Sequence, residues 1–283
     1  MLACSVRCSA QPQTRLAQAE RPGRWAHIGK RGTPFRSTPA ANSAKTAAAA
    51  PEVVEPAAHA SKDSAESVVE KYNREMAEKM GWTNLANPFE YNFDRGLYYH
   101  YVAPDLVVGS QPRHAADVDD LAKEGVTHIL NLQQDKDLEY WNVSLHEISS
   151  RSAHHGMHLI RTPAVDFSPH SLRDTLPRAV REQELARAAG GKVYVHCTAG
   201  LGRSPAVAIA SLYWFTDMQL DEAYAYLTGI RPCGPNKDAI RGATYDLLSN
   251  RPHEHFQHEP DHAFATLSSQ DRDVIRAKLL GNH

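Results

Sequence analysis

Hydrophobic residues fall into short runs, separated by longer amphipathic stretches, from about residue 87 to residue 249. Four runs rich in Val, Ile and Leu predict buried strands at 105–109, 126–132, 157–161 and 192–196. Helical spacing of apolar residues predicts helices at 117–124, 144–155, 172–189, 204–218, 221–229 and 237–249. Strands that alternate with helices predict an α/β fold, with a central, mostly parallel sheet flanked by helices.

The two ends of the chain follow other patterns. Residues 1–60 lack periodicity, and the first 50 residues hold eight Lys or Arg but a single acid, Glu20. An Arg-rich, Ser-containing, acid-poor start is typical of an organelle transit peptide; the alternative is a disordered regulatory tail. Val68, Val69, Tyr72 and Met76 share one side of a short helix in the predicted linker, 61–86. We expect the folded domain over 87–250 and a C-terminal extension packed on it over 251–283.

Composition limits the compartment and the partners. A chain of 283 residues with 42% hydrophobic residues can build a core without disulfides, and its four cysteines favour a reducing compartment. The net charge is −2, so the +7 of the first 50 residues leaves −9 for the rest. An acidic body argues against nucleic acid or an anionic membrane as partner. No apolar run has the length of a membrane span.

One loop carries the chemistry. The residues HCTAGLGRS, 196–204, lie between a predicted strand and a helix that starts at Pro205. Two glycines let such a loop curl, so that its amides face one centre and bind a tetrahedral dianion. The residues predicted to bind phosphate are Thr198, Ala199, Gly200, Leu201, Gly202 and Arg203.

The same loop offers a nucleophile. Amides and the helix start favour the thiolate of Cys197, and the Arg203 guanidinium can hold two phosphate oxygens. We expect His196 to orient the loop, and Ser204 to donate a hydrogen bond to the sulfur. The alternatives are a small buried cysteine beside a Gly-rich loop, or a rhodanese-like or arsenate-reductase loop. The full set of residues favours a phosphatase over each of these.

A leaving alkoxide needs a proton, which predicts an acid on a neighbouring loop. Asp166 follows the third predicted strand and is the predicted general acid, which then deprotonates the attacking water. This mechanism needs no cofactor and no metal. Several histidines, among them His154, His155 and His253, raise a metal hypothesis, but a solvated surface is the favoured interpretation.

The motif Cys-polar-Ala-Gly-aliphatic-Gly-Arg at 197–203 resembles the signature of dual-specificity phosphatases. More narrowly, it resembles that of the plant glucan phosphatases, chloroplast enzymes of starch degradation. The segments 108–112, 130–141 and 231–244 also look like this group, and the resemblance covers residue 87 to the C-terminus. It implies the dual-specificity phosphatase fold and removal of phosphate monoesters from starch, with preference for carbon 3 of glucose.

The resemblance also implies where glucan binds. Starch or amylopectin chains are the expected partner, in the chloroplast stroma at the granule surface, and we expect a monomer. Sugar rings need aromatic platforms, and the expected ones are Tyr99, Tyr140, Trp141 and Phe167, whose alternative role is core packing. Phe264 and Asp271 are expected to line a C-terminal glucan site.

Two other functions stay open at this point. One is a dual-specificity protein phosphatase with the same chemistry, and the other is a non-catalytic glucan-binding scaffold. A phosphoinositide phosphatase is disfavoured, because Thr198 and Leu201 are neutral. Cys233 either pairs with Cys197 under oxidation or, as we favour, is a buried structural thiol.

Overall fold

Short aliphatic runs form the centre of the molecule, because Val, Ile and Leu suit strands that are covered on both faces. The computed structural model describes residues 66–79, 91–249, 251 and 253–281, all of which belong to one compact unit. The predicted transit peptide at 1–60 lies outside the described residues, as do Cys4, Cys8 and residues 61–65 and 80–86 of the predicted linker.

The described strands form one five-stranded sheet in the order β1-β2-β5-β3-β4. Their bounds are Tyr99–Ala103 (β1), Leu106–Gly109 (β2), His128–Asn131 (β3), His158–Arg161 (β4) and Val193–His196 (β5). Only β1 runs antiparallel to its neighbour, β2. The α/β prediction and its four strands are confirmed. β1 was not predicted, because its Tyr-His-Tyr start lacks the aliphatic run of a central strand.

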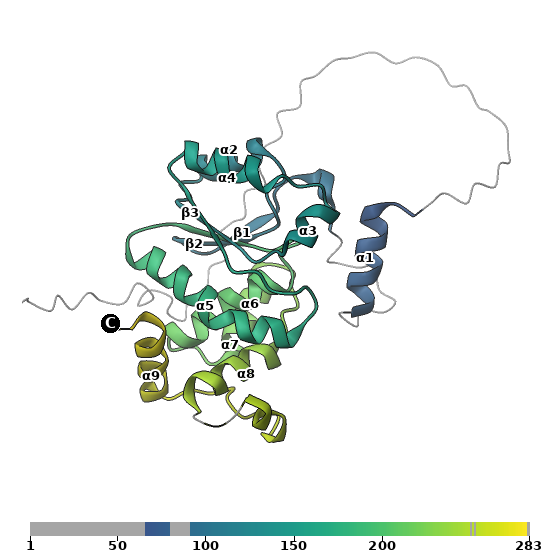
Figure 1. The fold of residues 1–283 in the computed structure, drawn as a ribbon. Coiled ribbons are helices and arrows are strands. Elements are labelled where there is room, and N and C mark those ends of the chain that lie inside the picture. The colour runs from purple at the N-terminus through teal and green to yellow at the C-terminus, as the bar shows by residue number, and fades with distance from the viewer. Residues whose placement is uncertain (1–65, 80–90, 250, 252, 282–283) are drawn as a thin grey trace, which may run out of the picture. The chain divides into compact units, whose positions relative to one another are not determined.

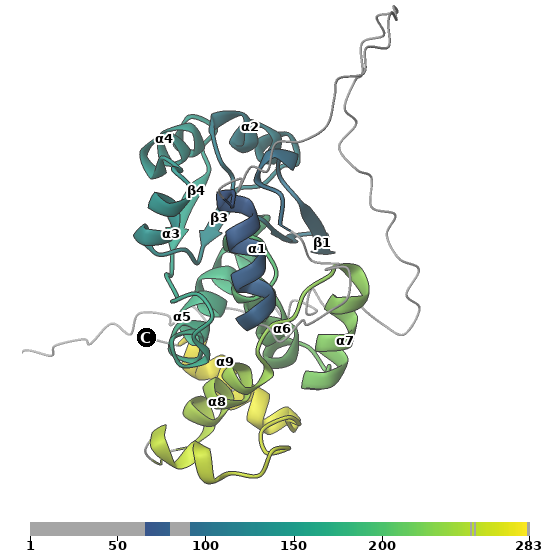
Figure 2. The same ribbon diagram turned by 90° about the vertical axis from the view of Figure 1, so that its right-hand side faces the viewer.

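Helices cover both faces of the sheet (Figure 1). α2 (Ala115–Lys123) and α4 (Leu145–His154) pack together on one face, and α5 (Pro169–Ala188) and α6 (Arg203–Phe215) pack on the other. α6 is buried along almost its whole length. The remaining helices are α1 (Val68–Lys79), α3 (Asp135–Tyr140), α7 (Leu220–Ile230), α8 (Lys237–Leu248) and α9 (Ser269–Leu280). Figure 2 shows α7, α8 and α9 beyond α5 and α6, on the side away from α2 and α4.

The C-terminal helix is bound to the rest of the fold by its basic side chains. Arg272 donates hydrogen bonds to the carbonyls of Tyr213 and Met218, and Arg276 donates to the carbonyl of Trp214. α9 therefore closes the far side of α6. Among the described residues, no helix has both the length and the apolar character to cross a membrane.

The register of the sheet decides where the chemistry lies. Gly109 of β2 pairs with His196 of β5, which pairs with Asn131 of β3, which pairs with Arg161 of β4. These four residues end their strands, so the segments that follow emerge at one edge of the sheet. In an open α/β sheet this carboxyl edge is the usual place for a ligand.

Candidate active site

The loop 197–202 connects the end of β5 to the start of α6, as the sequence predicted. Gly200 has a φ of +72°, and a Cβ added there would lie 2.5 Å from the Gly109 carbonyl oxygen. Only glycine fits both constraints. α6 starts at Arg203 after Gly202, with no side chain capping its first amides. These amides lack intrahelical partners, which makes the start of α6 suited to an anion.

Cys197 is buried, with 3% of its surface exposed, and it is a free thiol. The Ser204 hydroxyl donates a hydrogen bond to its Sγ over 3.4 Å. His196 Nδ1 lies 3.0 Å from the Cys197 carbonyl oxygen, and burial lowers the pKa of His196 to about 4. A neutral imidazole that donates to this carbonyl fixes the turn from β5 into the loop.

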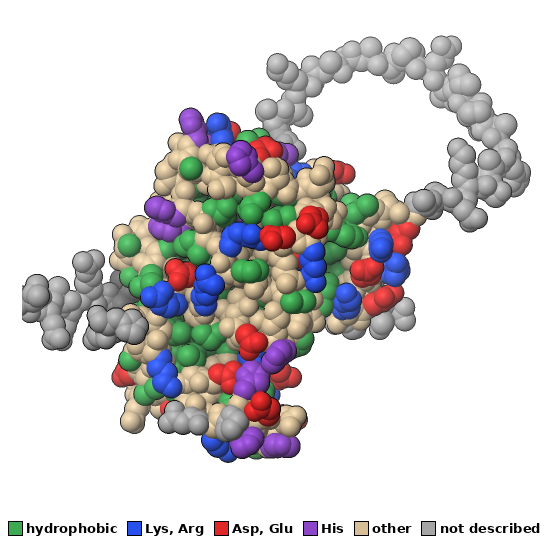
Figure 3. Space-filling view, in the orientation of Figure 1, with side chains coloured by type: hydrophobic (Ala, Val, Ile, Leu, Met, Phe, Trp, Pro, Cys, Tyr) green, Lys and Arg blue, Asp and Glu red, His purple; other side chains and the backbone are tan. Residues whose placement is uncertain are grey.

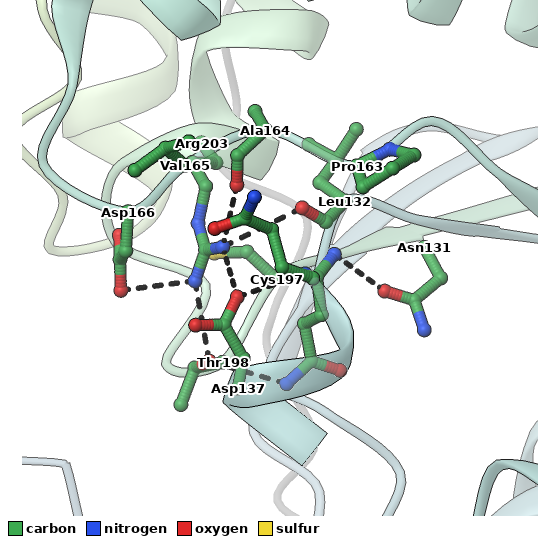
Figure 4. Close-up of polar contacts among 12 residues, drawn as sticks. Asn131, Leu132, Asp137, Pro163, Ala164, Val165, Asp166, Cys197, Thr198 and Arg203 are labelled. Carbon is green, nitrogen blue, oxygen red and sulfur yellow. Dashed lines mark hydrogen bonds and ion pairs between the residues drawn. The ribbon is translucent and has the colours of Figure 1, made fainter. Parts of the chain in front are cut away.

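Arg203 lies at the centre of the site, as Figure 4 shows. Its Nη2 is 2.9 Å from Asp166 Oδ2, and its Nη1 is 2.6 Å from Asp137 Oδ2. It also donates to the carbonyls of Leu132 and Ala164. Burial alone lowers the pKa of Arg203, but the negative charges of Asp166, Cys197 and Asp137 raise it overall. The guanidinium is thus charged and held at the edge of the loop.

Asp166 lies on the loop between β4 and α5, with 22% of its side chain exposed. Burial raises its pKa, the negative charge of Asp137 adds to this, and Arg203 opposes it. The next residue, Phe167, has a left-handed φ of +58°, and its amide donates to Asp166 Oδ1. The Ser171 hydroxyl accepts from the Val165 amide, which fixes this loop to the start of α5.

Sequence reasoning missed a supporting layer around the loop. Asp137 forms an ion pair with Arg203. The side-chain amide of Gln133 donates hydrogen bonds to the side-chain oxygen of Gln111 and to the Thr198 hydroxyl. Fully buried Arg231 donates to the carbonyl of Val108, beside Gly109. Four of these residues lie in the segments that resemble the glucan phosphatases, namely Gln111, Gln133, Asp137 and Arg231. The sequence indicated those segments but gave these side chains no role, because the roles depend on contacts between distant strands.

Three predicted platforms, Tyr140, Trp141 and Phe167, belong to one group of aromatic residues near the loop. We call the aromatic cluster the set Tyr91, Phe93, Tyr140, Trp141 and Phe167. Trp141 stacks on Phe93 with centroids 5.1 Å apart, and it meets Tyr91 edge-on at 5.2 Å. Ala199 and Leu201 of the loop pack in the same buried group of side chains. Tyr91 and Phe93 were not predicted, since they belong to no regular strand pattern.

The other predicted sugar contacts lie in different surroundings. Tyr99 of β1 is half-buried and packs against Tyr194 and Tyr101, beside the core. Phe264 meets the ring of Tyr245, while Asp271 closes the capping box that starts α9. Asp271 therefore has a structural role that explains its position, and the C-terminal glucan site stays a prediction.

In the described part of the chain, one group of side chains has the donor atoms for a metal ion, namely His170, Asp174 and His253. His170 Nδ1 lies 3.3 Å from His253 Nε2, and the remaining ring nitrogens face Asp174 at 3.7 Å and Asp246 at 3.4 Å. Each ring nitrogen thus has a partner within the protein. A chain of polar contacts between α5 and the 3-10 helix His253–His258 accounts for the group.

Cys233 is the other free cysteine that the structure describes. Burial raises its pKa to about 11, which keeps the thiol protonated. The amide of the next residue, Gly234, donates to the Leu201 carbonyl of the loop. These contacts fit the favoured interpretation of a buried structural thiol.

Comparisons with known proteins agree with this geometry. Residues 106–241 match the family described as the dual specificity phosphatase catalytic domain. The chain is 38% identical over 182 residues to the amyloplastic phosphoglucan phosphatase DSP4 of Castanea sativa, covering 64% of this chain and 47% of that protein. It is 33% identical over 159 residues to the chloroplastic phosphoglucan phosphatase LSF1 of Arabidopsis thaliana, covering 56% of this chain and 27% of the relative.

A shorter match reaches a human protein, dual specificity protein phosphatase 16, at 40% identity over 75 residues, or 26% of this chain and 11% of the other. The chain thus spans less than half the length of each of these relatives. Residues 106–241 thus match the dual specificity phosphatase catalytic domain in sequence, and they hold β2, β3, β4 and β5 of the sheet.

Proposed function

We propose that this protein is a phosphoric monoester hydrolase that removes phosphate from starch glucan through a phosphocysteine intermediate. The observation that carries the proposal is the meeting of Cys197, Arg203 and Asp166 at one edge of the sheet. A non-catalytic scaffold would not need a nucleophile, a cation and an acid with a raised pKa in one place.

In the first step the Cys197 thiolate attacks phosphorus and the ester bond breaks. The sugar alkoxide leaves and takes the proton of Asp166, which must therefore start as the neutral acid. Arg203 and the loop amides hold the equatorial oxygens of the transferring phosphoryl group.

In the second step the Asp166 carboxylate accepts a proton from water, which attacks phosphorus and displaces the thiolate. The Ser204 hydroxyl, 3.4 Å from the sulfur, stabilises that leaving thiolate. Inorganic phosphate then departs and the enzyme returns to its starting protonation state.

Support for glucan as the substrate comes from the named activity of two relatives and from the aromatic cluster. Aromatic rings provide flat apolar faces of the kind that sugar rings pack against. The relatives are named as plastid proteins, and the N-terminal composition fits import. We therefore place the protein in a plastid, and at finer detail in the chloroplast stroma at the starch granule surface, as a monomer. Carbon 3 of glucose is the proposed position of the ester.

The test measures phosphate release from starch labelled separately at carbons 3 and 6 of glucose. We expect release mainly from carbon 3, and none from the Cys197→Ser variant. Tyr140→Ala, which alters an exposed platform, should reduce activity on starch without reducing activity on p-nitrophenyl phosphate. Hydrolysis of p-nitrophenyl phosphate without release from starch would exclude glucan and favour the protein phosphatase alternative.

A further inference from the structure

Helix α1 has two faces of different character. Val69, Tyr72 and Met76 pack inward, with Met76 2% exposed. The opposite face carries charged, exposed side chains, and Arg74 pairs there with Glu66 and Glu78. Figure 3 shows acidic and basic side chains gathered on the surface over α1. A short helix of this type is held by what its apolar face contacts, not by its own propensity.

The inward face of α1 contacts the aromatic cluster. The ring of Tyr72 lies 5.1 Å from Trp141, 5.8 Å from Tyr91 and 6.4 Å from Tyr140, measured between centroids. Under this helix Trp141 and Tyr91 are only 7% and 6% exposed. A platform for a sugar ring must present its face to the ligand, and these two do not while α1 is in place.

Polar contacts fix the position of the helix along the cluster. The Asn73 side chain donates to the Tyr91 carbonyl and accepts from the Tyr91 amide, each over 2.8 Å. The Tyr140 hydroxyl donates to the Val68 carbonyl, and the Lys79 ammonium lies 4.7 Å from the ring centre of Phe167. α1 thus contacts the cluster at its start, its middle and its end.

The charges of the catalytic residues also act on the Tyr72 hydroxyl. Burial raises its pKa well above the ordinary value, the negative charge of Asp166 adds to this, and Arg203 opposes it. The charge of Cys197 acts on the same hydroxyl. The ring of Tyr72 is enclosed by Trp141 and Tyr91, and it packs in the same group of side chains as Ala199 and Leu201 of the loop.

We propose that α1 is an internal occupant of the aromatic cluster, with Tyr72 in the substrate's place, and that α1 and substrate exclude each other. A long glucan meets several platforms at once and can displace the helix, whereas a small phosphate ester gains too little contact to do so. The helix would then favour polymeric substrates over small ones. The exclusion rests on the phosphatase site alone, and its effect on starch rests on the proposed function.

Hydrogen exchange of the unmodified full-length protein tests the exclusion directly. We expect saturating maltohexaose to accelerate amide exchange in α1, because the free helix is short and exchanges readily. Slower exchange in α1 would overturn the proposal, since it would make α1 part of the glucan site. Unchanged exchange in α1, at a maltohexaose concentration that protects residues 137–143, would overturn it as well.

Variants of the full chain test the same point without glucan. Tyr72→Ala and Asn73→Ala should lower KM for p-nitrophenyl phosphate at least about threefold with kcat unchanged, because both shift α1 toward the released state. Alkylation of Cys197 by iodoacetamide, followed on its own peptide, should accelerate in parallel. Lys71→Ala, on the exposed face, is the matched control and should change neither quantity.

An unchanged KM and alkylation rate in folded Asn73→Ala protein would refute the proposal. If Tyr72→Ala fails to fold, Asn73→Ala and the exchange experiment decide. The p-nitrophenyl phosphate assay separates this inference from the proposed function. Release of α1 that activates the enzyme on the aryl ester, with no activity on starch in any variant, would leave the inference standing and remove glucan as substrate.

Discussion

Arg203 and Asp166 form an ion pair, with Nη2 2.9 Å from Oδ2 (Figure 4). In the proposed mechanism each has a different task, since the guanidinium binds phosphate oxygens and the acid protonates the leaving group. A phosphate dianion offers Arg203 a stronger acceptor than a single carboxylate. Its arrival would therefore release Asp166 and let that carboxyl group take up the proton it must donate.

Asp166→Asn should have an effect that depends on the leaving group. An asparagine cannot supply a proton, so turnover of a sugar phosphate should fall by about 10²–10⁴-fold. p-Nitrophenolate leaves without protonation and should lose far less. The measurement compares kcat for glucan phosphate and p-nitrophenyl phosphate in the two proteins. Equal losses on the two substrates would contradict the role of Asp166 as the acid.

The pH at which the alkaline limb of the pH–rate profile begins should depend on the charge of Asp137. Burial raises the pKa of Asp166, so the acid stays protonated to a higher pH and kcat falls as pH rises through that pKa. Asp137 contributes to the upward shift by its charge. Asp137→Asn removes that charge, so the alkaline limb should begin at a lower pH. Glu139→Gln, on the exposed side of α3, is the control and should leave the profile in place.

Gly200→Ala should disable the loop without unfolding the protein. The φ of +72° and the 2.5 Å approach to the Gly109 carbonyl leave no room for a Cβ, so the loop amides must move. Displaced donors should lower kcat/KM by about a hundredfold. Gly156→Ala is the comparison, because Gly156 has a similar φ of +68° but open space around it. That variant should keep normal activity.

His196 should make the fold sensitive to acid. Burial lowers its pKa from 6.5 to about 4, so its stabilising contribution is present above pH 6.5 and is lost as pH falls toward 4. Between pH 7 and pH 5 this group should lower the free energy of unfolding by about 2 kcal/mol. His196→Asn keeps an N–H donor and removes the titration. Urea unfolding at both pH values should therefore show a smaller loss in the variant; an equal loss would assign the acid sensitivity to other groups, such as His100.

The sequence by itself determined the catalytic loop and most of the fold. Local pattern was enough for the four aliphatic strands, because full burial of Val, Ile and Leu depends little on the identity of the neighbours. The loop 196–204 was also readable, since its glycines, its nucleophile and its cation must be adjacent in the chain to surround one anion. β1 was missed because an edge strand is stabilised by its partner and can tolerate polar residues.

Only the tertiary structure decided which distant residues serve the loop. Asp137 contacts Arg203 because β3 and β5 pair in a register that ends both strands at one edge, and no local pattern encodes that register. The sequence placed Val68, Val69, Tyr72 and Met76 on one side of a helix, and the structure leaves Val68 exposed and packs the other three inward. The pattern showed that this side is apolar, but it could not show what the side contacts. That α1 covers the aromatic cluster follows from shape and contact between segments far apart in the chain, and these exist only once the chain has folded.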